Sequence, residues 1–182
     1  MTIDRALFLF DGPNFYKNLI ASKLQRGHLD FYKLASNLAL ARQVVDVVLF
    51  TSPTDQRTDP INYANQQKFF TNVKSSGVTL KLGTLTWKKT ECPQCNFISY
   101  VKVEKSVDVQ IALDIVLRLD EFDTLYLASC DSDLIPAITF AKLQGKKVFM
   151  LLPDKAKGYA VSGACDATIP IKQKTLDAAQ AV

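Results

Sequence analysis

Short apolar runs that each stop at a turn are the feature of this sequence that most restricts its fold. The first run, 6–10, ends at Asp11-Gly12-Pro13. Side chains point alternately to the two faces of a strand, so an unbroken apolar run is typical of a strand that is buried on both faces. Three further runs also end in polar residues or proline: 44–50, which Asp46 interrupts, 125–128 and 148–152. The sequence therefore predicts four short buried strands.

Helical segments lie between these runs. Residues 78–82 alternate more than the other runs and predict a fifth strand, nearer an edge of the sheet. A weaker helix is expected after Asn14, and Gly145 is a suitable stop for the last helix. Strands that alternate with helices form right-handed crossovers, which favours an α/β, Rossmann-like three-layer sandwich with a mostly parallel five-stranded sheet. The helices with the clearest pattern are 31–42, 60–76, 107–119 and 134–144.

Length and composition favour one domain. The chain has 182 residues, of which 48% are hydrophobic, enough for one substantial core. Its apolar runs are far shorter than the roughly 18 residues that span a bilayer. The start of the chain also lacks the pattern of a secretory signal. We expect a single domain over 1–182 in the cytoplasm, without a membrane partner and with a small hairpin insertion at about 84–104.

Acidic residues follow two of the predicted strands. Asp11 closes the first strand, while Asp131 and Asp133 come directly after the run 125–128. Ligands of parallel sheets bind beyond the carboxyl ends of the strands. Clustered carboxylates repel one another, and Mg²⁺ or Mn²⁺ would relieve that repulsion. The alternative is structural: Asp11 makes a turn with Gly12, and Asp131 or Asp133 caps the helix that follows.

Helix geometry adds Asp108 to this group. On a helical wheel Asp108 falls on the apolar side with Ile111 and Ile115, so its side chain is expected to point inward. A structural role is the alternative, because an acid in the first turn favours the helix dipole. Asp114 and Arg118 lie four residues apart on the polar side and predict an exposed ion pair, with an outer role near the metal as the alternative for Asp114.

Other phosphate chemistries fit poorly. The chain has neither a GxxxxGK[ST] loop nor a GxGxxG motif after its first strand. Asp11-Gly12-Pro13 lacks the second aspartate of a haloacid dehalogenase phosphatase. The sole histidine, His28, lies in a polar stretch typical of a surface, so a serine–histidine catalytic triad is not supported. A metal held by carboxylates can instead activate water against a phosphodiester. Lys105, three residues before Asp108, is either a phosphate contact or a solvated lysine.

Three sequence blocks carry a resemblance to a known family. They are 10–16 (FDGPNFY), 105–114 (KSVDVQIALD) and 129–136 (SCDSDLIP), and they resemble the NYN domain family, including its LabA-like branch. The resemblance implies a PIN-like nuclease fold in which four aspartates bind magnesium or manganese and cut RNA: Asp11, Asp108, Asp131 and Asp133. It also implies that Asn14 and Ser162 contact the substrate. Members of the family often have glycine where this chain has Ser106 and Cys130.

The hairpin segment carries a second motif, Cys92-Pro93-Gln94-Cys95. A CxxC pair at the tip of a hairpin is the geometry that zinc uses, but it supplies only half of a four-coordinate site. Zinc would therefore need further ligands, for example from a second subunit in a homodimer. The alternatives are a redox-sensitive pair and two unliganded thiols.

Aromatic and basic residues alternate along the same segment. Single-stranded RNA is bound by such surfaces, because bases stack on aromatic rings while lysines follow the backbone. The alternative is a hairpin whose apolar face packs on the domain. The residues concerned are Trp87, Phe97, Tyr100, Lys88, Lys89, Lys102 and Lys105.

These observations favour a metal-dependent endoribonuclease. The main alternative is a nucleic-acid-binding or regulatory module that keeps the acidic pocket but has little or no activity. A weaker alternative is a phosphohydrolase that acts on small molecules.

Overall fold

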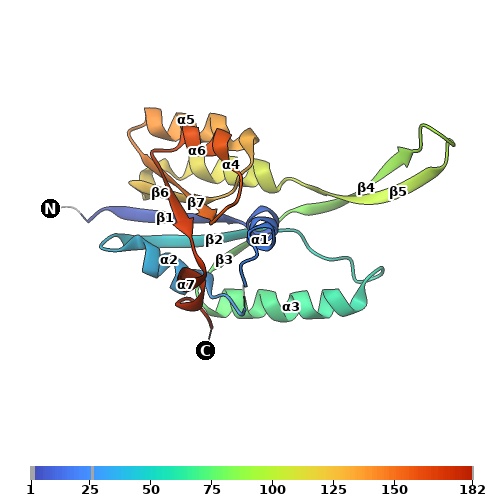
Figure 1. The fold of residues 1–182 in the computed structure, drawn as a ribbon, viewed down its shortest axis with the longest axis horizontal. Coiled ribbons are helices and arrows are strands. Elements are labelled where there is room, and N and C mark those ends of the chain that lie inside the picture. The colour runs from blue at the N-terminus through green and yellow to red at the C-terminus, as the bar shows by residue number, and fades with distance from the viewer. Residues whose placement is uncertain (1–2, 26, 182) are drawn as a thin grey trace.

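A parallel sheet lies at the centre of the computed structural model, which describes residues 3–25 and 27–181. Within that part of the chain the sheet has six strands in the order β3-β2-β1-β6-β7-β8 (Figure 1). Every neighbouring pair is parallel. The strands are β1 (Arg5–Asp11), β2 (Gln43–Thr51), β3 (Thr79–Leu82), β6 (Thr124–Ala128), β7 (Lys147–Pro153) and β8 (Ala167–Ile171).

Helices cover both faces of this sheet (Figure 1). One face is covered by α1 (Gly12–Ala21), α2 (Phe31–Ala39), α3 (Pro60–Ser75) and α7 (Gln173–Asp177). The other face is covered by α4 (Val107–Leu117), α5 (Ile135–Leu143) and α6 (Tyr159–Ala164). Two 3₁₀ turns, η1 (Leu119–Glu121) and η2 (Ser132–Leu134), follow α4 and β6. The three layers agree with the α/β architecture expected from the sequence.

The central strand β1 shows why its apolar run is unbroken. Phe8 and Phe10 point into the core beneath α1 and α2, whereas Leu7 and Leu9 point into the core beneath α4 and α5. All four side chains are fully buried. Phe8 also stacks on Tyr126 of the neighbouring strand β6, with ring centroids 4.2 Å apart.

The expected number of strands was wrong, because the sheet has a sixth strand, β8, on the edge beyond β7. This strand pairs with β7 through the register Phe149↔Ala167 to Pro153↔Ile171. It is only partly buried and contains Pro170, which lacks a backbone donor and is tolerated on an edge strand. The short apolar pattern that identifies the inner strands is therefore missing here.

Two further strands form a separate antiparallel hairpin that projects from the sheet (Figure 1). They are β4 (Thr84–Glu91) and β5 (Ile98–Lys105), and the turn between them contains Cys92 and Cys95. Most side chains of both strands are exposed. The sequence left open whether an apolar face of the hairpin packs on the domain. Such packing is limited to the root of the hairpin, where β4 begins and β5 ends.

In residues 3–25 and 27–181 none of the helices has both the length and the apolar character needed to span a membrane.

Candidate acidic site at the carboxyl ends of the strands

Adjacent strands bring two of the predicted aspartates to one end of the sheet. β1 and β6 are paired in parallel, so both end at the same edge. The Ser129 hydroxyl donates to Asp11 Oδ2 at 2.7 Å and accepts from the backbone N–H of Asp131 at 3.1 Å. Ser129 thus connects the end of β1 with the segment that follows β6.

Asn14 makes a second connection between these segments. Its side-chain oxygen accepts from the backbone N–H of Cys130 at 3.0 Å and from Asn18 Nδ2 at 2.8 Å. Its own backbone N–H donates to Asp11 Oδ1 at 3.2 Å, so Asp11 caps α1. Asn14 therefore holds α1 against the segment after β6.

The structural alternative for the aspartates is realised in part. Besides Asp11 on α1, Asp131 caps η2 by accepting from the backbone N–H of Asp133 at 2.9 Å. Capping engages one oxygen of each carboxylate, and the Ser129 hydroxyl engages the second oxygen of Asp11. Each carboxylate oxygen can accept more than one bond, so a cap and a metal ligand are compatible at both positions.

A cavity of about 280 Å³ lies where these segments meet the start of α4 and the root of the hairpin. Its lining includes three of the four predicted aspartates, together with Asn14 and Lys105. Glu104 and Lys17 also line it, although no sequence pattern pointed to either residue. The residues around the cavity are Asp11, Pro13, Asn14, Lys17, Glu104, Lys105, Ser106, Val107, Asp108 and Asp131.

Two predicted residues lie outside this lining. Asp133 is exposed, but its charge still acts on Asp108. The Ser162 hydroxyl is 2.6 Å from Thr168 Oγ1, in a hydrogen bond between α6 and β8. The structure therefore brings Asp11, Asp108 and Asp131 together, with Asp133 at the margin and Ser162 elsewhere.

The inward orientation expected for Asp108 was wrong, because its side chain is exposed. Asp108 lies in the first turn of α4, at the rim of the cavity rather than above the core. Asp114 is instead the buried acid of this helix, with 8% exposure. Lys81 Nζ contacts both Asp114 oxygens at 2.6 and 2.8 Å, while Arg118 lies 3.7 Å away. The predicted exposed pair is thus a charged cluster between α4 and the sheet.

Negative charge dominates the electrostatics of the cavity. Asp11 is 3% exposed, and its pKa is raised to about 6, chiefly by this burial and also by the charges of Asp108 and Glu104. The hydrogen bonds from Ser129 and Asn14 oppose the increase. Burial also raises the pKa of Glu104, and the charge of Asp108 adds to this increase. The pKa of Asp108 is raised by partial burial and then by Asp131 and Asp133. A cation in the cavity would lower all three.

The donor chemistry of the cavity suits a hard divalent cation, because its acidic groups are carboxylates and Mg²⁺ and Mn²⁺ prefer oxygen ligands. As the side chains are placed, however, the described residues contain no group of three His, Cys, Asp or Glu side chains close enough to hold a metal ion. Binding would therefore require the carboxylates to turn toward one another. The exposed Asp108 has room to do so.

Ser106 enters α4 in a strained conformation. Its φ of 76° lies in the left-handed region that favours glycine, and its side chain makes no capping bond to the helix. The hydroxyl donates instead to the Lys105 carbonyl. This backbone geometry gives a physical reason why members of the family that the sequence resembles often have glycine at this position.

Replacing Ser106 by glycine is expected to raise the free energy of unfolding by about 0.5–1 kcal/mol, because relief of the left-handed strain exceeds the added entropy of the unfolded chain. Urea denaturation measures the change. Ser132→Gly, in η2, is the matched control and is expected to lower stability, since Ser132 has no positive φ. Equal effects of the two variants would contradict the strain assigned to Ser106.

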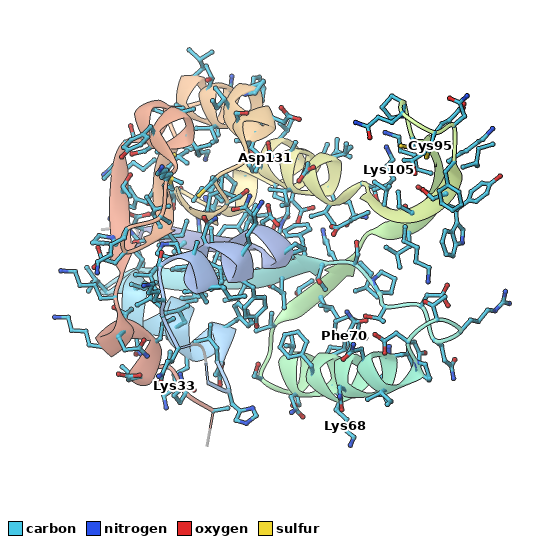
Figure 2. The ribbon with its side chains drawn as sticks, turned by 45° about the vertical axis from the view of Figure 1, so that its right-hand side comes forward. Lys33, Lys68, Phe70, Cys95, Lys105 and Asp131 are labelled. Atoms are coloured by element: carbon cyan, nitrogen blue, oxygen red, sulfur yellow. The ribbon has the colours of Figure 1, made fainter. Side chains whose placement is uncertain are left out.

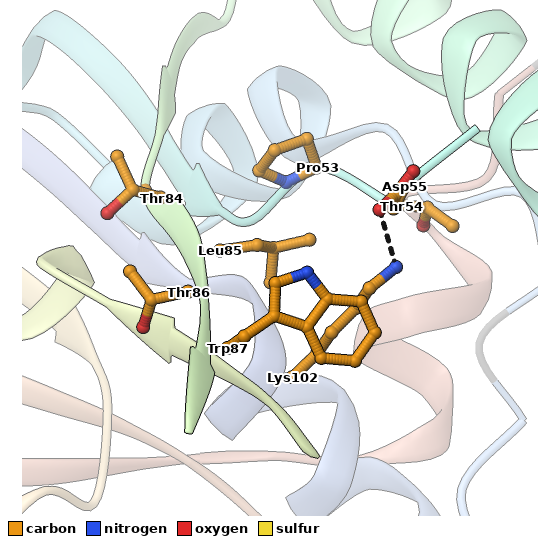
Figure 3. Close-up of a pocket in the computed structure, with 9 residues that line it drawn as sticks. Pro53, Thr54, Asp55, Thr84, Leu85, Thr86, Trp87 and Lys102 are labelled. Atoms are coloured by element: carbon orange, nitrogen blue, oxygen red, sulfur yellow. Dashed lines mark hydrogen bonds and ion pairs between the residues drawn. The ribbon is translucent and has the colours of Figure 1, made fainter. Parts of the chain in front are cut away.

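A second cavity, of about 400 Å³, lies where the first residues of β4 face residues 53–55. Figure 3 shows the Trp87 ring on its wall, with Lys102 beside it and linked to Asp55. Lys102 Nζ is 4.9 Å from the centroid of the Trp87 ring and 2.7 Å from Asp55 Oδ2. Trp87 is 58% exposed. Its ring therefore presents open aromatic surface beside a fixed cation.

Comparisons with known proteins concern the fold and the family. A family model for the NYN domain matches residues 5–172. The crystal structure of a protein of unknown function from Vibrio parahaemolyticus is similar, with a TM-score of 0.68 at 17% identity. The alignment covers 93% of this chain and 94% of that chain, and at this identity the likeness concerns the fold. No curated protein matches this chain.

Proposed function

The chain belongs to the NYN domain family, and on that premise we propose that it is a metal-dependent endoribonuclease. NYN domains are generally nucleases. The observation that carries the proposal is the acidic cavity, in which Asp11, Asp108 and Asp131 come from three separate segments of the chain. The three segments come together at the carboxyl ends of the strands, and this is the end of a parallel sheet at which ligands bind.

The metal ligands we propose are Asp11, Asp108 and Asp131, with Asp133 beside them. Glu104 is an added candidate, because it lines the same cavity and its charge acts on Asp11. A bound Mg²⁺ or Mn²⁺ would supply positive charge to phosphate oxygens and acidify a water molecule for hydrolysis. Ser129 keeps Asp11 in place through the bond to Oδ2.

Basic side chains at the cavity are suited to the RNA backbone. Lys17 of α1 and Lys105 of β5 both line it. As point charges they would attract the phosphate groups on either side of the scissile bond. Asn14, which also lines the cavity, maintains the position of α1 through its bond to Cys130.

The root of the hairpin connects the acidic cavity with the second cavity, which Trp87 lines. Glu104 and Lys105 of β5 line the first cavity, while Trp87 of the paired strand β4 lines the second. A single-stranded RNA that follows this root would present its backbone to the carboxylates and stack a base on Trp87. Single-stranded RNA is therefore the substrate class we propose.

Trp87→Ala is expected to weaken the binding of single-stranded RNA by about 10-fold, because a base–aromatic stack contributes about 1–3 kcal/mol. Fluorescence anisotropy with a labelled oligonucleotide, in chelator to prevent cleavage, measures the affinity. Phe140→Ala removes another exposed aromatic ring, on α5, and should leave affinity unchanged. An unchanged affinity for Trp87→Ala would remove the hairpin root from the RNA path.

Substrate choice tests the activity itself. Purified protein with Mn²⁺ is offered end-labelled single-stranded RNA, DNA of the same sequence and a chromogenic phosphomonoester. Internal cuts in the RNA are the expected result. Turnover of the monoester without cleavage of RNA would instead identify a phosphohydrolase of small molecules.

One observation favours a second function, namely a nucleic-acid-binding or regulatory module. In the part of the chain that the structure describes, no three carboxylates converge as a metal site would require. If they stay apart in the presence of metal, RNA can bind the basic and aromatic surface without being cut. Retained RNA binding without cleavage at any Mg²⁺ or Mn²⁺ concentration is the result that this function predicts.

A further inference from the structure

The hairpin tip is a tight turn that the acidic site does not use. β4 ends at Glu91 and β5 begins at Ile98. The backbone N–H of Cys92 donates to the Phe97 carbonyl at 2.9 Å, and the N–H of Asn96 donates to the Cys92 carbonyl at 2.9 Å. Asn96 has a φ of 53°, which reverses the chain directly after Cys95. The two cysteines are thus held within one closed turn.

The turn also places backbone amides near sulfur. The backbone of Gln94, and then that of Cys95, lowers the pKa of the Cys92 thiol. Both thiols are free, with Cys92 half-buried and Cys95 exposed. A CxxC turn whose amides solvate a thiolate is the arrangement that presents two cysteines to one zinc ion.

Two thiolates are only half of a structural zinc site, which takes four ligands. Across residues 3–25 and 27–181 no third His, Cys, Asp or Glu side chain is close enough to form a metal-binding group with them. A zinc ion at this turn would therefore take its remaining ligands from another molecule. The hairpin tip projects away from the sheet (Figure 1). Figure 2 shows Cys95 on the hairpin, apart from Asp131.

The surface beside the tip favours a second hairpin as the other molecule. Phe97, Ile98 and Tyr100 are exposed, so the tip and the first residues of β5 carry apolar surface that a partner would cover. Lys88 and Lys89 of β4 are exposed as well. Four thiolates around Zn²⁺ leave a net charge of about −2, which lysines from two chains would balance.

We propose that Cys92 and Cys95 form one half of a tetrahedral zinc site, and that the same two cysteines of a second copy of this chain complete it. The two molecules are joined tip to tip, and each cysteine thiol that binds releases its proton to the solvent. The acidic cavities lie at the hairpin roots, away from the junction. This inference is independent of the proposed nuclease activity.

The test uses the full chain, reduced and stripped of metal, to which Zn²⁺ is added at one equivalent per two chains. Analytical ultracentrifugation should show a doubling of the mass from 20.2 kDa, with zinc co-migrating at one ion per two chains. Co²⁺ in place of Zn²⁺ should give the thiolate-to-metal absorption of a tetrahedral sulfur site, which binding at the carboxylates would not give.

Cys92→Ser and Cys95→Ser should each remain monomeric and lose the thiolate-to-Co²⁺ absorption. Cys130→Ser, which removes a thiol from the acidic end of the sheet, should dimerise like the wild-type protein. Circular dichroism checks that each variant is folded. Zinc bound at one ion per chain by a monomer, no zinc retained at all, or a dimer that persists in Cys92→Ser would each overturn the proposal.

Discussion

Replacing Asp131 by asparagine is expected to lower the rate of RNA cleavage by about 10³-fold, because several kcal/mol of transition-state stabilisation would depend on the metal that we propose this carboxylate holds. The fold should be unaffected. The new asparagine would keep a side-chain oxygen that can accept from the backbone N–H of Asp133, as Asp131 does in the structure. The variant should therefore still bind RNA.

Single-turnover cleavage of end-labelled RNA with excess protein measures the chemical step separately from binding. Asp177→Asn is the matched control: it makes the same chemical change on the exposed face of α7, outside the lining of the acidic cavity. Its rate should equal that of the wild-type protein. A rate for Asp131→Asn within a few fold of wild type would exclude Asp131 from the metal site.

Asp11→Asn is expected to stabilise the metal-free protein while it abolishes cleavage. Burial raises the pKa of Asp11 to about 6, from an ordinary value of 3.8, so the charged form is disfavoured in the fold. At neutral pH that shift corresponds to about 2–3 kcal/mol, which asparagine would recover. Asparagine can still accept from the backbone N–H of Asn14 and donate to the Ser129 hydroxyl.

The pH dependence gives the sign of this effect. Between about pH 4 and pH 6 the folded protein binds more protons at Asp11 than the unfolded chain does, so the wild-type protein loses stability as pH rises through this window. The gain from Asp11→Asn should therefore be full at pH 7.5 and shrink by about half at pH 5. Comparing the two proteins at each pH cancels the titration of all other groups.

Urea denaturation in chelator measures both stabilities. Added Mn²⁺ should then stabilise the wild-type protein and leave Asp11→Asn almost unchanged, because only the wild type binds the ion tightly. A variant that is less stable than wild type in chelator at pH 7.5 would show that the buried carboxylate does not destabilise the fold.

Much of the sheet was predictable because its inner strands are buried on both faces. The five strands expected from apolar runs are all present, and the strand expected nearer an edge, β3, lies at one edge. The edge strand β8 and the short helices α6 and α7 have no such run. Their place in the fold depends on pairing and packing with β7 and with the core, which local periodicity does not record.

The candidate site was predictable where it depends on strand ends. Asp11 and Asp131 line one cavity because β1 and β6 are neighbours. Asp108 lies in the first turn of its helix, as predicted, but its side chain does not point into the core. A helical wheel assumes that the core lies beneath every turn, and the first turn of α4 borders the cavity instead. Glu104 and Lys17 gave no sequence signal, because the hairpin root and the position of α1 bring them to the cavity.

We propose that this NYN domain cuts RNA with a metal held by its carboxylates. The most direct test is the cleavage rate of an end-labelled single-stranded RNA by wild-type protein in Mn²⁺, in chelator, and after Mn²⁺ is restored. Internal cuts are expected with Mn²⁺, none in chelator, and the rate should recover when the metal returns. Cleavage that persists in chelator, or RNA that binds but stays intact at every metal concentration, would contradict it.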